Sequence, residues 1–452
     1  MADRSQRVLL LIIAIGFFMQ SLDATILNTA LPSIAADLHA SPLKMQMVVI
    51  SYILTVALLI PTSGWLADRF GTQRLFLAAI IFFCLGSLLC SLSTTLWQLV
   101  AARVVQGIGG AFLQPIGRLV VLRSFPGKDF VRALSFVTIP ALVGPLLGPT
   151  VGGWLAQYAT WHWIFLINLP IGVIGLWGVS KKMPNFRQPT PVFDWAGFAF
   201  FGGGLLMLSL ALQGLGDRAL STALSLCLLL AGCALQMTYW LRAFKVEQPL
   251  FSPSLFKIPT YAIGMFGNIF SRLGSGSMPF LTPLFLQLSL GFSPSKAGLM
   301  MIASAASAIS AKTVVTILLA RWGYRMVLST NTILLGLMMA SFALVTPQTP
   351  LLLLLVQLAF FGFINSVQFT AMNSLTLQDL GTEVVSSGNS LFSVIMQLSM
   401  SFGIAVSSVF LNLFSQDGVE RAFHLTYLLV GALTLCASMI FLQVRREDAR
   451  RV

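Results

Sequence analysis

One carboxylate lies inside an apolar segment that is long enough to cross a bilayer. Residues 8–31 read VLLLIIAIGFFMQSLDATILNTAL, and a helix needs about 20 apolar residues to span the hydrocarbon core. Asp23 lies about 22 Å from the Val8 end of such a helix, at about 1.5 Å per residue. An unpaired carboxylate at that depth is costly, so Asp23 is expected to carry a proton or to find a partner. Reversible protonation there is what proton-driven transport requires, and a structural Asp bonded to a neighbouring helix is the alternative.

The composition of the chain predicts an integral membrane protein. Of its 452 residues, 57% are hydrophobic and 9% are charged, whereas a soluble globular protein carries about 25% charged residues. The net charge of +13 is scattered among short loops, which favours the charge asymmetry of a membrane protein over nucleic-acid binding. All five cysteines fall in apolar stretches without a CxxC pair, so the sequence indicates neither a disulfide framework nor a metal site.

Apolar runs separated by Gly, Pro and charged turns predict fourteen membrane-spanning helices. They are expected at 8–31, 44–66, 75–94, 97–121, 133–158, 163–180, 194–214, 219–241, 261–290, 296–319, 325–346, 350–374, 385–414 and 423–443. With the N-terminus inside, the inner segments hold nineteen of the 27 basic residues and the outer segments hold four. Both termini are therefore expected to be cytoplasmic.

The second half of the sequence echoes the first at a spacing of 252 residues. The segment Ser41-Pro42-Leu43-Lys44 recurs as Ser293-Pro294-Ser295-Lys296, and Arg69-Phe70-Gly71 recurs as Arg321-Trp322-Gly323. Parallel repeats in a membrane protein predict two bundles with a central site. We expect an N-terminal six-helix bundle at 1–182, a linker and two extra helices at 183–258, and a C-terminal six-helix bundle at 259–452.

Five segments carry a resemblance to a known family. They read LDATILNTALP at 22–32, GWLADRFGTQR at 64–74, RVVQGIGGA at 103–111, GPLLGPTVGG at 144–153 and WHWIFLINLPIG at 161–172. With these motifs in this order, the sequence resembles the major facilitator superfamily, specifically its fourteen-span drug–proton antiporters, and within them multidrug-type exporters of Gram-negative bacteria. The resemblance implies an all-α membrane protein of the major facilitator fold, with two six-helix bundles plus two inserted helices. It also implies a transporter that is driven by a proton gradient and needs no cofactor.

Asp23 and Arg103 are the candidate proton-coupling pair. Counted from the outer ends of their helices, Arg103 lies about 9 Å deep and Asp23 about 8 Å deep. A cation beside Asp23 would favour the charged carboxylate, and its removal would favour protonation. In the second half of the repeat, Leu358 stands at the position that matches Arg103, so only the first half has the ion pair. A purely structural salt bridge is the alternative.

The inner loop after the second span is a candidate conformational motif, comprising Gly64, Asp68, Arg69, Gly71 and Arg74. Gly64 is expected to let helices approach, and Gly71 to allow a tight reversal with positive φ. Asp68 could cap the amino end of a facing helix, where an anion is favoured. The resemblance implies that it latches one conformation, and a solvated loop charge is the alternative.

A glycine-rich face in the fifth span is the candidate antiporter motif, comprising Gly144, Pro145, Gly148, Pro149, Gly152 and Gly153. Small residues spaced by about four positions allow close backbone contact in membranes, and the prolines invite a kink. In an antiporter such a face could seal one bundle against the other. Ordinary helix packing is the alternative.

A candidate substrate cavity comprises Gln20, Asn28, Gln114 and Arg272. Arg272 lies about 17 Å into its predicted helix, and the repeat matches it to Gln20, one turn from Asp23. An unpaired cation would favour neutral or anionic molecules over lipophilic cations.

The expected function is proton-coupled efflux of small molecules across the bacterial inner membrane, of multidrug type. An exporter of an organic acid or of its metal complex is a second possibility, and a membrane-embedded enzyme or a channel belongs to other classes. The three histidines fall at predicted outer helix ends, which argues against an enzyme. The expected partners are a small-molecule substrate, protons and membrane lipids, without nucleic acid, and the protein is expected to be a monomer.

Overall fold

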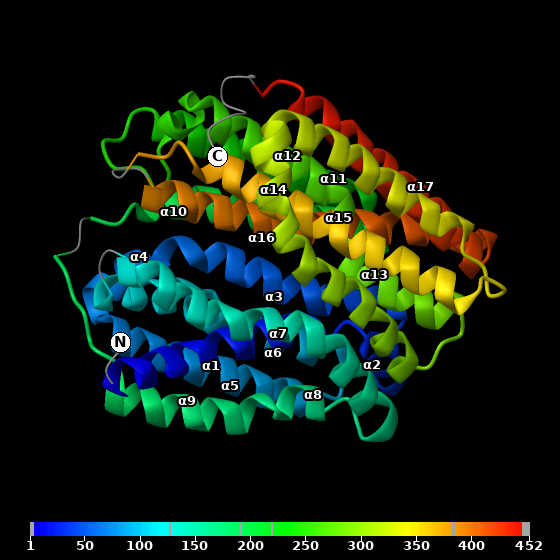
Figure 1. The fold of residues 1–452 in the computed structure, drawn as a ribbon, viewed down its shortest axis with the longest axis horizontal. Helices are drawn as coiled ribbons and strands as arrows, with labels where there is room; N and C mark the ends of the chain where they lie inside the picture. Colours follow the sequence, from blue (N-terminus) through cyan, green and yellow to red (C-terminus); the bar gives the residue numbers. More distant parts are fainter. Residues whose placement is uncertain (1–3, 126–127, 190–191, 218–219, 382–384, 445–452) are drawn as a thin grey trace. The chain divides into compact units, whose positions relative to one another are not determined.

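The computed structural model describes residues 4–125, 128–189, 192–217, 220–381 and 385–444, and these residues form long helices joined by short turns (Figure 1). In the part of the chain that is described, eleven helical stretches are long and apolar enough to cross a membrane. The all-α prediction is therefore confirmed for these residues. The chain divides into two compact units, the first comprising Met1–Phe193 and Phe292–Ile302, the second Asp194–Gly291 and Ala303–Val452.

The first unit is built around two long helices, α6 (Leu96–Ser124) and α7 (Lys128–Tyr158), in contact with the helix that carries Asp23, α1 (Arg4–Ile26). α3 (Gln46–Leu59) and α5 (Thr72–Ser91) pack against α6, and α9 (Asn168–Lys182) packs against α1 and α5. Its remaining helices are α2 (Leu31–Asp37), α3 (Gln46–Leu59), α4 (Ser63–Phe70), α5 (Thr72–Ser91), α8 (Trp163–Leu166) and α9 (Asn168–Lys182).

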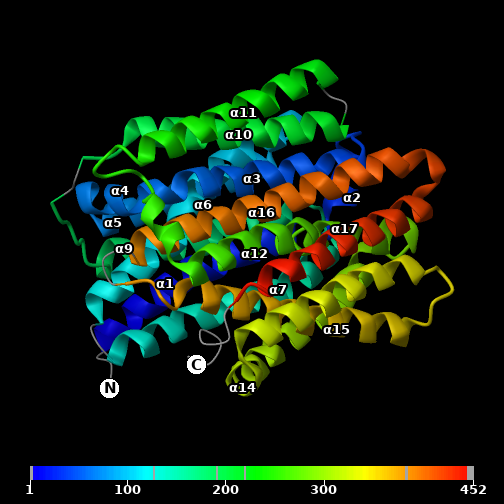
Figure 2. The ribbon, with the colours of Figure 1, turned by 90° about the horizontal axis from the view of Figure 1, so that it is seen from above.

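The second unit contains the two extra helices as a hairpin, α10 (Trp195–Asp217) and α11 (Thr222–Ala243), which lie side by side in Figure 2. α10 also packs against α16 (Val385–Phe414). α12 (Pro259–Ser275) packs against α16 and also against α15 (Leu351–Leu377) and α17 (Val419–Phe441). The other helices of this unit are α12 (Pro259–Ser275), α13 (Met278–Leu284), α14 (Pro294–Ser341), α15 (Leu351–Leu377), α16 (Val385–Phe414) and α17 (Val419–Phe441). The first turns of α14 belong to the first unit.

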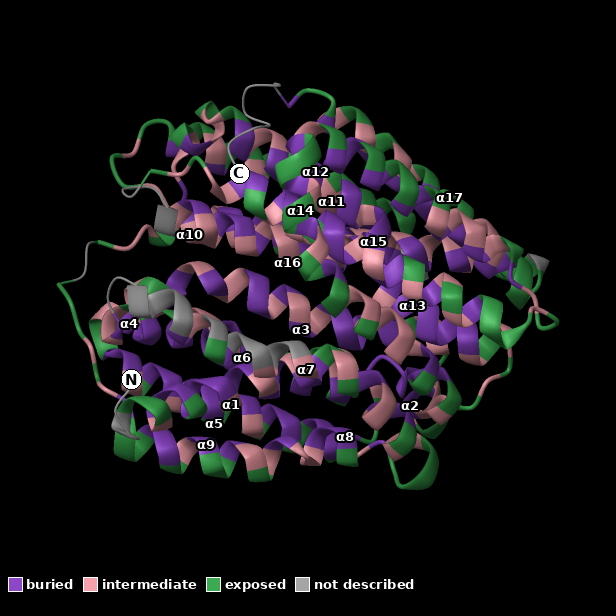
Figure 3. Cartoon of the chain, in the orientation of Figure 1, coloured by how far each residue is buried: buried purple, intermediate pink, exposed green. Residues whose placement is uncertain are grey.

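Burial follows the expectation for helices in lipid. Figure 3 shows buried residues along the helices and exposed residues on outward faces and at the loops. Large apolar side chains on those faces stay exposed, including Trp177 at 69% on α9 and Leu230 at 70% on α11. An apolar outer face is what a bilayer requires.

Four predicted spans contain a break in the helix with a proline in or after it, although Pro42–Phe70 and Trp163–Lys182 are each long and apolar enough to cross a membrane as one stretch. The span at 44–66 is divided by a 3₁₀ turn that contains Pro61, and the span at 163–180 is divided between α8 and α9, ahead of Pro170. The span at 261–290 ends as α12 before Pro279 and resumes as α13. The span at 8–31 ends as α1 at Ile26, and α2 begins at Leu31, directly before Pro32. A proline has no N–H to donate to the preceding turn, so the helix breaks.

The internal repeat has a counterpart in the backbone. Gly71 has φ 98° and Gly323 has φ 71°, so the matched inner loops both reverse at a glycine in a conformation that other residues rarely adopt. Gly323 divides the continuous stretch of α14 into the two predicted spans, 296–319 and 325–346. Gly107 and Gly362, matched by the repeat, pack closely against Thr55 on α3 and Ser304 on α14, respectively.

Candidate functional site

Asp23 and Arg103 form a buried ion pair in the first unit. Arg103 Nη1 on α6 donates to Asp23 Oδ2 on α1 at 2.7 Å, and each residue is 1% exposed. Arg103 Nε donates to the carbonyl of Val48 on α3 at 3.3 Å. The guanidinium also lies over the ring of Tyr52, 4.2 Å from its centroid. The predicted proximity is present, and the arginine connects three helices around the carboxylate.

Three neutral polar side chains complete the surroundings of Asp23. Gln106 Nε2 donates to Asp23 Oδ1 at 2.7 Å and to Ser87 Oγ at 2.8 Å. Asn168 Nδ2, at the start of α9, donates to Asp23 Oδ1 and to Ser87 Oγ, both at 3.2 Å. Arg103 Nη1 donates to Gln106 Oε1 at 2.6 Å. Asp23 thus accepts hydrogen bonds from three side chains, one of them charged.

Gln106, Ser87 and Asn168 were not predicted from the sequence as neighbours of Asp23. The signal for Gln106 was available, because it follows Arg103 by about one turn and therefore lies on the same helix face. Ser87 and Asn168 come from other helices, and only the fold brings them to Asp23. Asn168 is the first residue of α9, directly after the break that follows α8, so this polar side chain lies inside an otherwise apolar span.

The glycine face of α7 packs against α1. A Cβ atom added at Gly144 would lie 2.7 Å from the backbone nitrogen of Leu22, closer than real Cβ contacts. Gly148 and Gly152 approach the next turns of α1 in the same way. Thr25 Oγ1 donates to the carbonyl of Gly144 at 3.2 Å. The predicted small-residue face is therefore a close contact with the helix that carries Asp23.

The end of the glycine face contacts the first turns of α14 that belong to this unit. Side chains larger than Gly at positions 153 and 298 would meet backbone atoms of Pro294 and Pro149, respectively. Thr150 Oγ1 donates to the carbonyl of Gly298 at 3.2 Å. Pro145 lies on the exposed side of α7. Packing accounts for these contacts, and the sealing role stays a prediction.

The inner loop is held through Asp68. Arg123 Nη2, near the end of α6, donates to Asp68 Oδ1 at 2.7 Å and to Gln188 Oε1 at 3.1 Å. The Asp68 side chain is thus paired with Arg123, and the backbone N–H of Gln188 donates to the Asp68 carbonyl at 3.3 Å. The capping role stays a prediction. The side chain of Asp68 is 22% exposed, so it is neither free in solvent nor deeply buried.

The linker after α9 lies against the same loop. Gln73 donates its backbone N–H to Asn185 Oδ1 at 3.2 Å, and Thr72 donates its backbone N–H to the carbonyl of Phe186 at 3.1 Å. Asn185 occupies the space that a Cβ atom at Gly71 would fill. Gly71 is therefore required by its positive φ and also by this contact.

The other loop residues are more exposed. Gly64 has open space where a Cβ atom would lie, and its role in helix approach stays a prediction. Arg69 lies over the ring of Trp65, 5.0 Å from its centroid. Arg74 is exposed at the start of α5.

Replacing Asp68 by Asn is expected to lower turnover about fivefold with little change in substrate affinity. The substitution removes a partly buried charge pair that holds the inner loop, which is worth about 1 kcal/mol. Asp68 does not contact Asp23 or the side chains that donate to Asp23, so substrate binding should be retained. Transport rates and equilibrium binding measure the two effects, and Asp37→Asn, which removes another acid from this unit, is the control. A large loss of affinity with intact turnover would contradict the prediction.

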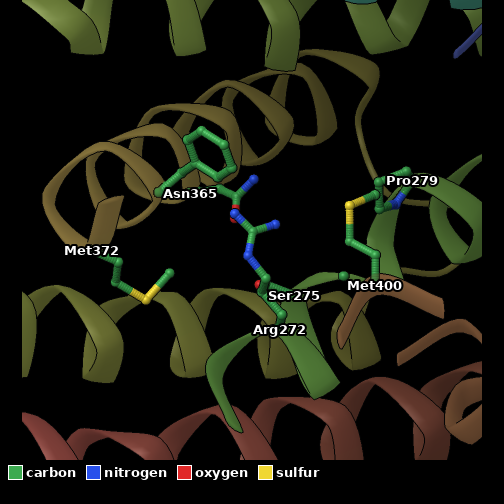
Figure 4. A pocket seen from close by; sticks show the side chains of 8 residues that line it. Arg272, Ser275, Pro279, Asn365, Met372 and Met400 are labelled. Carbon is green, nitrogen blue, oxygen red and sulfur yellow. The ribbon is translucent and has the colours of Figure 1, made fainter. Parts of the chain in front are cut away.

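Arg272 lines a pocket in the second unit, at the end of α12. The pocket encloses about 220 Å³ and is lined by Arg272, Ser275, Gly276, Pro279, Asn365, Phe369, Met372 and Met400. In Figure 4 the guanidinium extends among the labelled side chains of Asn365, Met372 and Met400. Arg272 Nε donates to Asn268 Oδ1 at 3.1 Å, and the guanidinium lies 4.5 Å from the centroid of Phe369.

The charge of Arg272 is uncompensated within the described part of the chain. The residue is 7% exposed, and its Nη2 has no hydrogen-bond partner there. No acidic side chain among the described residues forms an ion pair with it. A buried cation without a partner is costly, and the cost is compatible with a role in binding an anion.

The remaining predicted cavity residues lie in the first unit. Gln20 is buried on α1, one turn before Asp23. Asn28 is buried in the turn after α1, and its Nδ2 donates to the carbonyl of Ala24 at 3.5 Å. Gln114 is half-buried on α6. Among the described residues, no group of three or more His, Cys, Asp or Glu side chains could hold a metal ion.

Comparison with known proteins gives matches over nearly the whole chain. The sequence model described as "Major Facilitator Superfamily" matches residues 13–278 and 264–452. The "Putative multidrug resistance protein MdtD" of Pectobacterium atrosepticum is 46% identical, over 99% of this chain and 97% of that protein. The protein of the same name from Serratia proteamaculans is also 46% identical, over 96% of this chain and 92% of that protein.

Solved structures share the fold at low sequence identity. A peptide transporter crystallised in complex with sulfate has a TM-score of 0.75 at 12% identity, covering 99% of each chain. A D-xylose–proton symporter has a TM-score of 0.72 at 14% identity, covering 98% of this chain and 99% of that one. At such identities the likeness concerns the fold alone.

Proposed function

We propose that this protein, which belongs to the major facilitator superfamily, couples the entry of protons to the export of small molecules across the inner membrane of a bacterium. Membership makes it a membrane transporter rather than an enzyme, in agreement with the family and fold predicted from the sequence. The observation that carries the proposal is Asp23, a carboxylate that is 1% exposed among apolar helices and is paired with Arg103.

In this proposal Asp23 is the proton-binding group and Arg103 controls its charge. In the present arrangement Arg103 and Gln106 donate to the carboxylate and favour the ionised form. Protonation removes the attraction for Arg103, which also holds the carbonyl of Val48 on α3. The ion pair thereby links the charge of Asp23 to the packing of α3 and α6. Asp68 and the glycine face of α7 would bias which conformation the first unit adopts.

The remaining features of the proposal follow the sequence. The protein would act as a monomer with both termini in the cytoplasm, and the proton gradient would drive it without a cofactor. Multidrug-type export is supported by the names of the MdtD relatives and by Met and Phe side chains at the Arg272 pocket, which adapt to varied apolar surfaces.

Substrate-induced proton movement in proteoliposomes tests the proposal. The purified protein is reconstituted, and lumenal pH is followed while cations, neutral molecules and organic acids are added in turn. We expect at least one class to move protons in the direction opposite to the substrate, and a protonophore to abolish substrate accumulation. Substrate movement that is unaffected by collapse of the proton gradient would overturn proton coupling.

A second candidate substrate class, organic anions or their metal complexes, is favoured by Arg272. A carboxylate that entered its pocket would supply the missing partner of Nη2 and could contact Asn365. Charge-assisted hydrogen bonds between guanidinium and carboxylate are strong and directional. A lipophilic cation would instead meet an uncompensated positive charge.

Replacing Arg272 by Gln is expected to weaken binding of a carboxylate about 10- to 100-fold, because a hydrogen bond to a charged group is worth about 1.5–3 kcal/mol. Binding of a lipophilic cation of similar size should stay equal or improve. Titration of purified wild type and variant with both ligands measures this. Arg421→Gln, which removes an exposed charge from α17 in the same unit, is the control. Tight cation binding with neither affinity changed in the Arg272 variant would contradict the charge argument.

A further inference from the structure

The side-chain amide of Asn168 donates hydrogen bonds through its nitrogen, but its oxygen accepts none from the described residues. Its Nδ2 donates to Asp23 Oδ1 and to Ser87 Oγ. Its Oδ1 is buried and has no hydrogen-bond partner among the described residues, and the residue is 1% exposed. A buried acceptor without a donor destabilises the folded protein, so its place beside a proton-binding carboxylate calls for an explanation.

We propose that Asn168 reverses its amide when Asp23 is protonated, donating to the carboxylate in one state and accepting from the carboxylic acid in the other. The proposal rests on the proposed function, because it requires Asp23 to gain and lose a proton. Asn168 is a positioning residue in this account. It offers Asp23 a donor in the charged state and an acceptor in the protonated state.

The chemistry of the partners fixes the starting orientation. A carboxylate only accepts hydrogen bonds, so the amide NH₂ of Asn168 must face Asp23 while that group is charged. A protonated Asp23 carries an O–H donor and needs an acceptor. If the amide turns end for end, Oδ1 takes the place of Nδ2, 3.2 Å from both Asp23 Oδ1 and Ser87 Oγ. A carbonyl oxygen can accept two hydrogen bonds, so it could serve both hydroxyl groups.

Gln106 cannot make the same change at low cost. Its Oε1 accepts from Arg103 Nη1 at 2.6 Å, and its Nε2 donates to Asp23 and Ser87. Arginine only donates, so a turned Gln106 amide would place donor against donor at Arg103. Asn168 has no such constraint, because its Oδ1 has no partner in the part of the chain that the structure describes. Of the two amides that contact Asp23, only Asn168 can turn without breaking an existing bond of its carbonyl oxygen.

The ionisable groups around Asp23 do not supply the acceptor that a protonated Asp23 needs. Those that face it among the described residues are Arg103 on α6, Tyr52 on α3 and Cys90 on α5. The ring of Tyr52 lies against the guanidinium, 4.2 Å from its central carbon, and the Cys90 thiol lies 3.8 Å from Gln106 Oε1. On α9 the polar side chain at this depth is Asn168, and the described side chains of α7 include no Asp, Glu, Lys, Arg or His.

Infrared difference spectra between acidic and alkaline pH test the proposal on the purified protein in lipid. The acid C=O band of Asp23 is assigned by its loss in Asp23→Asn. In Asn168→Leu, which keeps a similar volume, we expect this band to move, because the acid O–H has lost its acceptor. In Asn168→Thr we expect it to stay near the wild-type position, because a hydroxyl can donate or accept. Asn331→Leu, which removes a buried amide from the second unit, should leave the band unchanged.

Two further readouts separate this role from a purely structural one. In wild type labelled with ¹³C-asparagine, the amide C=O band that disappears in Asn168→Leu should shift with pH. Export by Asn168→Leu should fall about tenfold, because one protonation state loses a hydrogen bond worth about 1.4 kcal/mol, and Asn168→Thr should recover most of it.

The outcomes distinguish the two proposals. An Asp23 acid band at the same position in wild type and Asn168→Leu, or an Asn168 amide band that is insensitive to pH, overturns the amide reversal alone. Identical spectra for wild type and Asp23→Asn show that Asp23 does not titrate, which overturns the proposed function as well. If Asn168→Leu fails to fold, the labelled wild type and Asn168→Thr still decide the question.

Discussion

Replacing Asp23 by Asn is expected to reduce proton-coupled export by about 100-fold or more, to background, because the variant has no group in the cluster that can take up a proton at physiological pH. Asn has nearly the same shape as Asp, and the site is lined by Arg103, Gln106 and Asn168. The protein should therefore still insert into the membrane. The measurement is substrate-driven proton flux in proteoliposomes that contain equal amounts of wild type and variant.

A gradient-independent assay separates loss of coupling from loss of the protein. Exchange of substrate across the membrane without a pH gradient should survive in Asp23→Asn. Asp37→Asn is the matched control, since Asp37 is an acid of the same unit whose partner is the Trp161 indole at 2.8 Å. Undiminished proton-coupled export by Asp23→Asn would show that another group carries the proton.

Much of the fold was predictable because lipid imposes a simple rule on sequence. Long apolar runs must form helices, since each backbone polar group needs a partner inside the bilayer. Periodicity also identified the glycine face of α7, and a three-residue repeat identified the reversals at Gly71 and Gly323. The breaks were harder, because Pro61, Pro170 and Pro279 interrupt hydrogen bonding without lowering the hydropathy of their segments.

The candidate site was predictable only where one pair of residues dominates it. Asp23 and Arg103 stand out because charge is rare in apolar segments. Ser87 and Asn168 do not, because neutral polar side chains occur in many membrane helices and their role depends on which helices meet. The contact of Asn185 with the inner loop was invisible for the same reason, since it joins segments separated by more than one hundred positions.

Replacing Arg103 by Met is expected to destabilise the protein by about 3–5 kcal/mol, because the substitution leaves a buried carboxylate without its counter-charge. Arg103 and Asp23 are each 1% exposed, so water cannot replace the lost partner. The loss should be smaller at acidic pH, since protonation of Asp23 removes the unpaired charge. Denaturant or thermal unfolding in detergent at two pH values measures both effects.

Combining the substitution with Asp23→Asn should restore much of the lost stability, because the double variant buries no charge at this site. Arg118→Met is the control, since Arg118 is an exposed arginine on the same helix, α6, and its loss should cost no more than about 0.5 kcal/mol. If the double variant is no more stable than Arg103→Met, the lost stability comes from the contacts of the arginine with Tyr52 and Val48 and not from the unpaired charge. Recovery in the double variant would instead assign the lost stability to the unpaired charge that Asp23 carries when Arg103 is removed.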